Sequence, residues 1–259
     1  MIELFIDMGN SRIKVALIDD GEYAYLGAFA IEQISTKMRT QSFFQQLDFV
    51  PDHVYISSVA DSSFERQITI AIEQKWHISP VFMSTQVTCC GIVNGYDKAS
   101  KLGVDRWMAL MGAQALTQCD FMVIDAGTAI TVDAVREGQH QGGMIVPGLH
   151  TLRQALTAKT AQLSEDCTHL NLPSKMTRPG GFLATNTQSA ICGGTLYMAA
   201  AFVNQVIFDL QSQANKPFKI YFTGGDGQRL SSLTNVPSEY VEDLVLQGII
   251  NVKENLKKG

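Results

Sequence analysis

The sequence lacks several features that mark common functional classes. Only 20 lysines and arginines stand against 25 aspartates and glutamates in 259 residues, so the net charge of −5 gives no support for a nucleic-acid or anionic-membrane partner. The 5 cysteines are odd in number and form no Cys-x-x-Cys pair, which is typical of a reduced, cytoplasmic compartment and offers no structural metal site. No apolar stretch approaches the roughly 20 residues that span a bilayer, and no basic leader precedes the first apolar run. We therefore expect neither a membrane span nor a signal peptide.

The pattern of apolar residues predicts an α/β protein with a real core. Hydrophobic residues make up 46% of the chain and charged residues 17%, which excludes a disordered protein. The length fits one large domain or two of roughly 120 residues each. Periodicity predicts helices over residues 33–47, 64–76, 104–118, 149–158 and 187–212 and a last helix from about residue 244. Short strands are expected at residues 53–59, 81–83, 144–146 and 219–222, and an irregular loop at residues 164–186.

One acidic turn occurs twice in the chain. Asp7-Met8-Gly9-Asn10-Ser11 follows one apolar run, and Asp125-Ala126-Gly127-Thr128 follows another, 118 residues later (125 − 7). Each turn precedes a second alternating run, so both segments read as hairpins and indicate a duplicated half. The boundary between the halves lies near residues 117–120, without a flexible linker, which gives domains 1–117 and 118–259.

Such a turn has the chemistry of a phosphate site. Glycine permits positive φ and a close approach of the backbone to a ligand, and backbone N–H groups with the Ser11 or Thr128 hydroxyl can donate to phosphate oxygens. The leading carboxylate suggests an intervening cation. A tight hairpin without a ligand explains a single copy equally well, whereas two copies favour a nucleotide site. Thr223-Gly224-Gly225-Asp226 adds a third glycine turn at a strand end, where ligands of α/β proteins gather.

Together these turns resemble those of the sugar-kinase, Hsp70 and actin superfamily. Within it, the segment from Tyr96 to Arg106 is similar to the pantothenate-binding signature of type III pantothenate kinases, as are residues 142–148, residues 156–163 and the pair Asn186-Thr187. The motifs span residues 7 to 226 in the family's order. Ala99 stands where the family usually has a proline, and we expect it to change loop stiffness without removing a reacting group.

The resemblance implies two tandem ribonuclease H-like (actin-like ATPase) domains around a central nucleotide cleft. It implies ATP-dependent phosphorylation of pantothenate to 4′-phosphopantothenate, the first step of coenzyme A biosynthesis, by a homodimer that uses ATP with Mg²⁺ and a monovalent cation, K⁺ or NH₄⁺. The implied ATP-binding residues are Asp7, Met8, Gly9, Asn10, Ser11, Arg12, Ile13, Lys14, Thr128, Gly224 and Gly225. The implied pantothenate-binding residues are Tyr96, Gly103, Val104, Asp105, Arg106 and Thr187, where Thr187 could act from the same subunit or from its partner, and Asp125 would coordinate the monovalent cation.

Asp105 is the candidate general base, and Arg106 can hold a carboxylate bidentately at the start of a helix. Alternatively, Asp105 caps that helix and Arg106 is a surface charge. Lys14 could also be a solvated strand residue, and none of the five scattered histidines receives a role. A non-catalytic nucleotide-binding regulator on the same scaffold is the second hypothesis. An actin-like or Hsp70-like assembly ATPase is the third, although two halves of this size leave no room for its additional domains.

Overall fold

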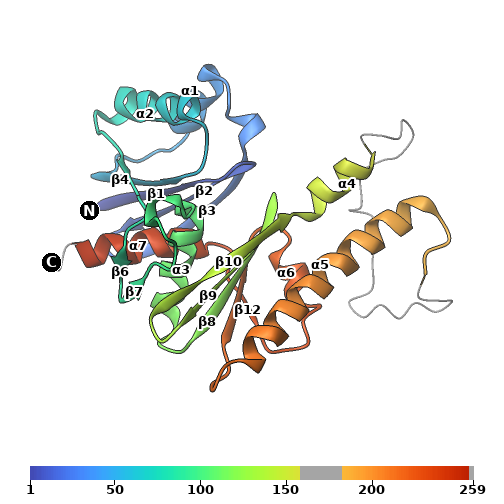
Figure 1. The fold of residues 1–259 in the computed structure, drawn as a ribbon. Helices are drawn as coiled ribbons and strands as arrows, with labels where there is room; N and C mark the ends of the chain where they lie inside the picture. The colour runs from blue at the N-terminus through green and yellow to red at the C-terminus, as the bar shows by residue number, and fades with distance from the viewer. Residues whose placement is uncertain (158–182, 257–259) are drawn as a thin grey trace. The chain divides into compact units, whose positions relative to one another are not determined.

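The computed structural model describes residues 1–157 and 183–256, and these form two compact units (Figure 1). The first unit contains Met1–Gln118, Gly138–His140 and the described part of Asp243–Gly259. The second unit contains Cys119–Glu137 and the described part of Gln141–Glu242. The predicted division at residues 117 and 118 therefore lies close to the first boundary between the units, while the C-terminal helix groups with the first unit.

The first unit is built on a five-stranded sheet in the order β3-β2-β1-β4-β5. β1 pairs antiparallel with β2 and parallel with β4, and β4 pairs parallel with β5. Figure 1 shows α1 and α2 together on one face of this sheet, where their apolar residues join Leu4, Ile6 and Met8 in one core. The elements are β1 (Ile2–Met8), β2 (Arg12–Asp19), β3 (Glu22–Ala30), η1 (Ile31–Gln33), α1 (Lys37–Gln45), β4 (His53–Ser58), α2 (Ser62–Trp76) and β5 (Val81–Phe82).

The second unit repeats this arrangement with the strands β10-β9-β8-β11-β12. β8 pairs antiparallel with β9 and parallel with β11, and β11 pairs parallel with β12. These strand directions match those of the corresponding pairs in the first unit. The elements are β8 (Phe121–Ala126), β9 (Ala129–Arg136), β10 (Gln139–Pro147), α4 (Leu149–Thr157), α5 (Thr187–Ser212), β11 (Lys219–Thr223), α6 (Gly227–Ser231) and β12 (Glu239–Tyr240). The repeated sheet order is the structural counterpart of the repeated acidic turn.

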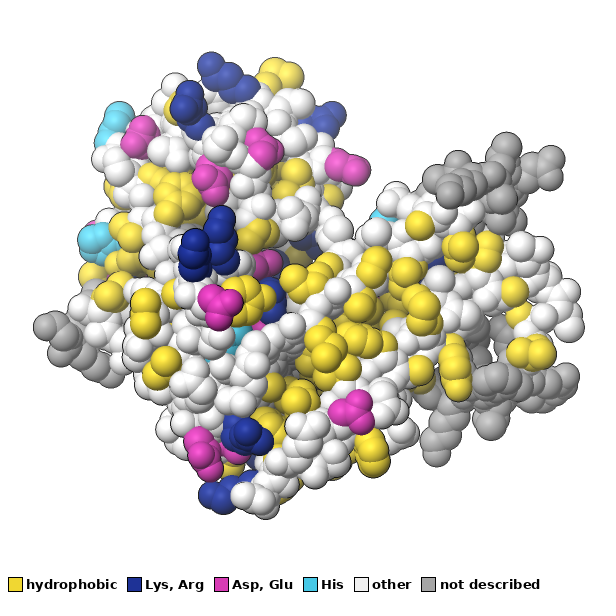
Figure 2. All heavy atoms as spheres, viewed as in Figure 1, with side chains coloured by type: hydrophobic (Ala, Val, Ile, Leu, Met, Phe, Trp, Pro, Cys, Tyr) yellow, Lys and Arg dark blue, Asp and Glu magenta, His cyan; other side chains and the backbone are white. Residues whose placement is uncertain are grey.

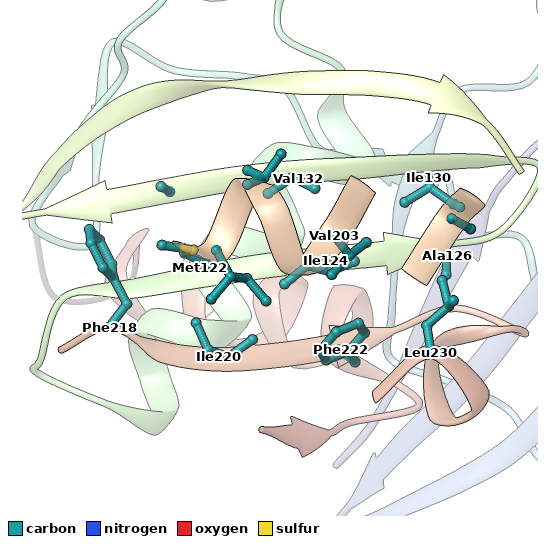
Figure 3. Packing of buried hydrophobic residues seen from close by; sticks show 14 of the residues in the cluster. Met122, Ile124, Ala126, Ile130, Val132, Val203, Phe218, Ile220, Phe222 and Leu230 are labelled. Carbon is teal, nitrogen blue, oxygen red and sulfur yellow. The ribbon is translucent and has the colours of Figure 1, made fainter. Parts of the chain in front are cut away.

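The core of the second unit lies between its sheet and α5. Figure 3 shows Met122 and Ile124 of β8 with Ile220 and Phe222 of β11 directed toward the helix residue Val203. Because side chains alternate along a strand, Asp125 lies on the opposite sheet face from Ile124. Asp7 is likewise on the opposite face from Ile6.

That opposite face of the first sheet is covered by α3 (Val104–Leu116) and α7 (Leu244–Leu256). Glu3 lies four residues before Asp7 in β1 and therefore on the same sheet face. It forms a buried ion pair with Lys253 of α7. The two helices approach so closely that a Cβ added at Gly248 would lie 1.8 Å from the Met108 carbonyl oxygen. Asp7 therefore shares a sheet face with the helix that begins at the predicted substrate residues.

A small hairpin precedes α3. It consists of β6 (Thr88–Cys89) and β7 (Ile92–Val93), and β7 pairs with Gln139, in the part of β10 that groups with the first unit. The 3₁₀ helix η2 (Ala99–Lys101) then leads to α3. This hairpin places the following segment, which contains Tyr96, beside the start of β10.

Two sequence expectations require correction. α5 is a 26-residue helix that is long and apolar enough, by length and composition, to cross a membrane, so the statement that no apolar stretch approaches that length is wrong. Its buried residues recur along the face that packs on the sheet, as in a core helix. The expectation drawn from the cysteines was a reduced compartment and included no disulfide, whereas Cys192 on α5 is disulfide-bonded. The predicted loop at residues 164–186 lies largely outside the described residues, as does most of the motif at residues 156–163.

Candidate functional site

The first acidic hairpin joins β1 to β2 in the first unit. The Gly9 amide donates to the Arg12 carbonyl oxygen (3.0 Å), which closes the turn, and the Ser11 carbonyl oxygen accepts from the Ile31 amide (2.9 Å). Asn10, Ser11 and Arg12 are exposed, whereas Asp7 is only 8% exposed at the end of its strand. The turn therefore presents backbone and hydroxyl donors to solvent, with a buried carboxylate at its base.

The neighbours of Asp7 follow from the strand register. Lys14 of β2 stands directly across from it on one side, and Ser57 of β4 on the other. Ser57 is fully buried. Met8 and Ile13 belong to the apolar core, so only their backbone atoms can serve a ligand.

The second hairpin, between β8 and β9, is held by a third segment. The Thr128 carbonyl oxygen accepts from the Gly148 amide (2.9 Å) and from the Thr151 hydroxyl (2.8 Å), both at the start of α4. A Cβ added at Gly148 would lie 2.1 Å from the Gly127 carbonyl oxygen, so only glycine fits there. Gly148 contacts the second hairpin directly, a contact that the sequence prediction missed, although the run of residues 142–148 contained this glycine.

The glycine turn after β11 completes this group. Gly224 has φ +85°, and a Cβ added there would lie 2.4 Å from Asp125 Oδ1 and 2.5 Å from the Ala126 carbonyl oxygen. The Asp226 amide donates to the same Ala126 oxygen (2.9 Å). The second unit thus brings Asp125, the Thr128 turn and Gly224 together at adjacent strand ends. Neither Gly9 nor Gly127 has positive φ, so the expectation that these two glycines adopt it is wrong. Among the three glycine turns predicted from the sequence, the turn after β11 has a positive φ, at Gly224.

In the first unit, Gly103 and Asp105 form the start of α3. Gly103 is the N-cap residue, and Asp105 Oδ1 accepts from the Arg106 amide (2.8 Å). A Cβ added at Gly103 would lie 2.6 Å from the same Oδ1 atom, so the missing side chain makes room for the carboxylate. Val104 opens the helix beside them. Asp105 therefore lies within the first turn of α3, where the positive end of the helix favours its carboxylate, while the N-cap position belongs to Gly103 and has no side-chain cap hydrogen bond.

Arg106 is not a surface charge. Its side chain is 7% exposed, its Nη1 donates to the Tyr96 hydroxyl (2.7 Å), and its guanidinium carbon lies 5.6 Å from the centre of the Tyr96 ring. A buried guanidinium is costly unless its donors are used. The fork is therefore fixed in place beside Tyr96, and fixed bidentate donors suit a carboxylate.

Two residues that the sequence did not single out hold Tyr96. The imidazole of His140 stacks on the Tyr96 ring, with ring centres 6.0 Å apart and planes 9° apart, and the Tyr96 amide donates to Asn94 Oδ1 (2.9 Å). His140 is buried, and its Nδ1 accepts from the Gly95 amide (3.4 Å). It stands 44 residues from Tyr96 in the sequence (140 − 96), and only the pairing of β7 with β10 brings the two together, so no local signal could reveal it.

Thr187 belongs to the second unit, where it is exposed in the first turn of α5. Asn186 caps that helix by accepting from the Ser189 amide (2.8 Å). Gly225 is exposed beside Gly224. Within residues 1–157 and 183–256, no three His, Cys, Asp or Glu side chains are grouped to hold a metal ion.

Comparison with known proteins gives a consistent family. Residues 3–209 match the family model described as type III pantothenate kinase. The chain is 40% identical to the type III pantothenate kinase of Hydrogenovibrio crunogenus over 98% of this chain and 99% of the relative, and 31% identical to that of Nitrosococcus oceani over 98% and 95%.

Solved structures support the fold alone. A protein from Campylobacter jejuni described as a Baf family transcriptional activator superposes with a TM-score of 0.58 at 21% identity over 98% of this chain and 99% of that chain. MreB 5 of Spiroplasma citri bound to AMPPNP gives 0.51 at 8% identity over 99% and 97%. Both are consistent with the two-domain fold of the actin and sugar-kinase superfamily.

Proposed function

The chain belongs to the type III pantothenate kinase family, and from this premise we propose how its residues divide the work of the reaction. The enzyme phosphorylates pantothenate with ATP in coenzyme A biosynthesis. A non-catalytic regulator on the same scaffold is not favoured, because the relatives covering the whole chain are named as kinases. Phosphoryl transfer asks mainly for positioning and charge stabilisation.

ATP is assigned to the two acidic hairpins and the third glycine turn. In the first hairpin, the exposed groups from Gly9 to Arg12 face the phosphates through amides and the Ser11 hydroxyl, and Met8 and Ile13 contribute backbone only. Asp7 faces the Mg²⁺-bound phosphates, and its neighbour Lys14 adds positive charge. In the second unit, Thr128 contacts the phosphates, while Gly224 and Gly225 line the adenosine side. The support is geometric, because these groups end adjacent strands within their own units.

Asp125 is assigned to the monovalent cation, K⁺ or NH₄⁺. The oxygen atoms around Asp125 support this assignment. Asp125 Oδ1 and the Ala126 carbonyl oxygen both border the position that a side chain at Gly224 would occupy. Oxygen donors grouped around a space kept open by glycine are the ligands that hard cations prefer. When bound, the cation would offset the repulsion between this carboxylate and the phosphates.

Pantothenate is assigned to the start of α3. Arg106 holds the substrate carboxylate, the Tyr96 ring forms one wall, and Gly103 and Val104 line the approach to Asp105. Asp105 accepts the proton of the primary hydroxyl as that oxygen attacks the γ-phosphorus. A carboxylic acid with a reference pKa near 3.9 is far more acidic than an alcohol, so this transfer comes late, as a loose transition state requires.

We further propose that the active form is a cytoplasmic homodimer joined through the outer face of α5. Figure 2 shows hydrophobic side chains gathered over α5 and β10, and the exposed ones include Met144, Ile145, Tyr197, Met198 and Phe208. An exposed apolar face of this kind marks an interaction site. Thr187, at the start of the same helix, would then complete the substrate site of either its own subunit or the partner. Neither nucleic acid nor membrane is proposed as a partner, and residues 1–117 and 118–259 are proposed as the tandem domains.

The test is ADP release from the purified full-length protein, with pantothenate omitted as the control. We expect pantothenate-dependent turnover that falls when K⁺ is replaced by Na⁺. Turnover that is insensitive to this exchange would remove the cation from Asp125. The absence of any pantothenate-dependent ADP from a folded, dimeric sample would contradict the assignment of the site as a whole.

A further inference from the structure

The β6–β7 hairpin carries two adjacent cysteines at its turn. Cys89 pairs with Ile92, which leaves Cys90 and Gly91 as a two-residue loop with φ +49° and +81°. This is the backbone of a type I′ turn, whose first position favours Asn, Asp or Gly because φ is positive there. Cys90 is an uncommon residue for that backbone, as is Glu137 with φ +52° in the turn before β10, so the turn alone does not account for two adjacent cysteines.

The two thiols are placed to react with each other. The Cys89 and Cys90 Sγ atoms are 3.5 Å apart, both side chains are partly exposed, and neither is in a disulfide. The two thiols are within hydrogen-bond distance, where either sulfur can donate, and this hydrogen bond lowers the pKa of Cys89 and raises that of Cys90. Since the thiolate is the nucleophile and the two sulfurs are 3.5 Å apart, one thiol can attack a disulfide and its neighbour can resolve the product, and the lowered pKa of Cys89 favours Cys89 as the attacking sulfur.

We propose that Cys89 and Cys90 form a reversible dithiol–disulfide modification site whose reaction partner is a small disulfide of the glutathione class. The Cys89 thiolate attacks one sulfur of the small disulfide, forms a mixed disulfide and releases one thiolate. Cys90 then loses its proton to solvent and attacks the Cys89 sulfur, which forms the Cys89–Cys90 bond and releases the second thiolate. The two protein thiols are oxidised by two electrons, and the small disulfide is reduced to two thiols.

The product is expected to be labile. Consecutive Cα atoms are about 3.8 Å apart, whereas bridged cysteines usually have Cα atoms about 4.4–6.8 Å apart. A bridge between neighbours is therefore strained and readily reduced, which is the property of regulatory disulfides. The reduced form returns when the thiol pool is restored.

The hairpin is connected to the segment that carries Tyr96. Asn94 closes the open end of the hairpin, because its amide donates to the Val87 carbonyl oxygen (2.8 Å) and its Nδ2 to the Gln86 carbonyl oxygen (3.2 Å). The same side chain then accepts from the Tyr96 amide (2.9 Å). Closing the ring at the turn must change its backbone angles, and this change reaches Tyr96 through Asn94. The predicted effect on pantothenate, unlike the chemistry of the cysteines, rests on the proposed role of Tyr96.

The experiment equilibrates the full-length protein in mixtures of reduced and oxidised glutathione, quenches it with an alkylating reagent and analyses the tryptic peptide of residues 76–98. This peptide contains no cysteines other than Cys89 and Cys90. We expect a product two hydrogen atoms lighter that dithiothreitol reverses, together with a roughly tenfold higher KM for pantothenate, equivalent to about 1.4 kcal/mol. Cys90→Asn, which suits the type I′ turn and removes the resolving thiol, should abolish the intramolecular product and the redox response of KM.

Cys119→Ser is the matched control, because Cys119 is another thiol outside any disulfide, and it should leave both responses intact. Recovery of the peptide with both thiols alkylated, or carrying two glutathione groups, at every redox ratio would overturn the proposal. If the lighter peptide forms and KM does not change, the modification site stands and the coupling to Tyr96 is wrong. If the protein shows no kinase turnover at all, the peptide analysis still decides the cysteine chemistry.

Discussion

Replacing Gly248 by alanine should destabilise the first unit, although alanine is the better helix former. The substitution gains about 1 kcal/mol of intrinsic helix propensity. Against this, the new Cβ would lie 1.8 Å from the Met108 carbonyl oxygen, 2.6 Å from the Met108 carbonyl carbon and 3.0 Å from the Gly112 amide nitrogen. All three distances are shorter than ordinary van der Waals contact, which begins at 3.4 Å. All three are backbone atoms of α3, so no side chain can rotate away.

The magnitude follows from how the helices must respond. Overpacking costs about 1–3 kcal/mol, and a clash with backbone belongs at the upper end, so we expect a net loss of about 2 kcal/mol in the free energy of unfolding. The same separation of α3 from α7 would displace Asp105, and misplacement of a catalytic group by about 1 Å can lower kcat about 10²-fold.

Gly194→Ala is the control at protein concentrations where the chain is monomeric, because Gly194 lies on the exposed face of α5 proposed for the dimer and a Cβ there would meet nothing within 4 Å of its own subunit. The same chemical change should therefore raise stability by about 1 kcal/mol. Urea unfolding followed by far-ultraviolet circular dichroism, repeated at several protein concentrations because a dimer's stability depends on them, gives both values. Stabilisation of similar size in both variants would refute the close packing of α3 on α7.

Three further changes test other contacts. Gly148→Ala places a methyl group 2.1 Å from a carbonyl oxygen of the second hairpin, so we expect the KM for ATP to rise about tenfold or more, and an unchanged KM would exclude this turn from the nucleotide site. Arg106→Lys keeps the charge but loses the planar fork beside Tyr96, and it should raise the KM for pantothenate more than the KM for ATP. An equal rise in both would contradict a carboxylate clamp. Lys253→Ala leaves Glu3 buried without its ion-pair partner and should cost about 3–5 kcal/mol in unfolding titrations, whereas a loss below about 1 kcal/mol would show that water reaches the carboxylate.

The duplicated architecture was predictable because its signals are local. An acidic turn between two alternating runs specifies a hairpin, and apolar periodicity gave the helices Val104–Leu116 and Thr187–Ser212 within about two residues. The predicted first residues of helices were less accurate where a capping side chain sets the start of the helix. The helix expected from residue 64 begins at Ser62, because Asp61 caps it by accepting from the Ser63 and Phe64 amides.

The remaining features depend on contacts between distant segments. His140 reaches Tyr96 through strand pairing, and Gly148 reaches the second hairpin through the start of α4, so neither has a local sequence signature. The burial of Arg106 could not be predicted from its charge, because it depends on the Tyr96 hydroxyl, which accepts a hydrogen bond from the guanidinium. The apolar length of α5 was underestimated because glycine, alanine and threonine interrupt its large residues.

The most direct test of the account is the kcat of Asp105→Asn in the ADP-release assay. Asparagine has nearly the same shape and can still accept the Arg106 amide at the start of α3, so stability should change little, while the loss of the general base should lower kcat by about 10²–10⁴-fold. Asp48→Asn, the same change at an exposed carboxylate outside the segment from Tyr96 to Arg106, should retain full activity. A normally folded Asp105→Asn enzyme with the kcat of the unmodified protein would reduce Asp105 to a helix cap and contradict the account.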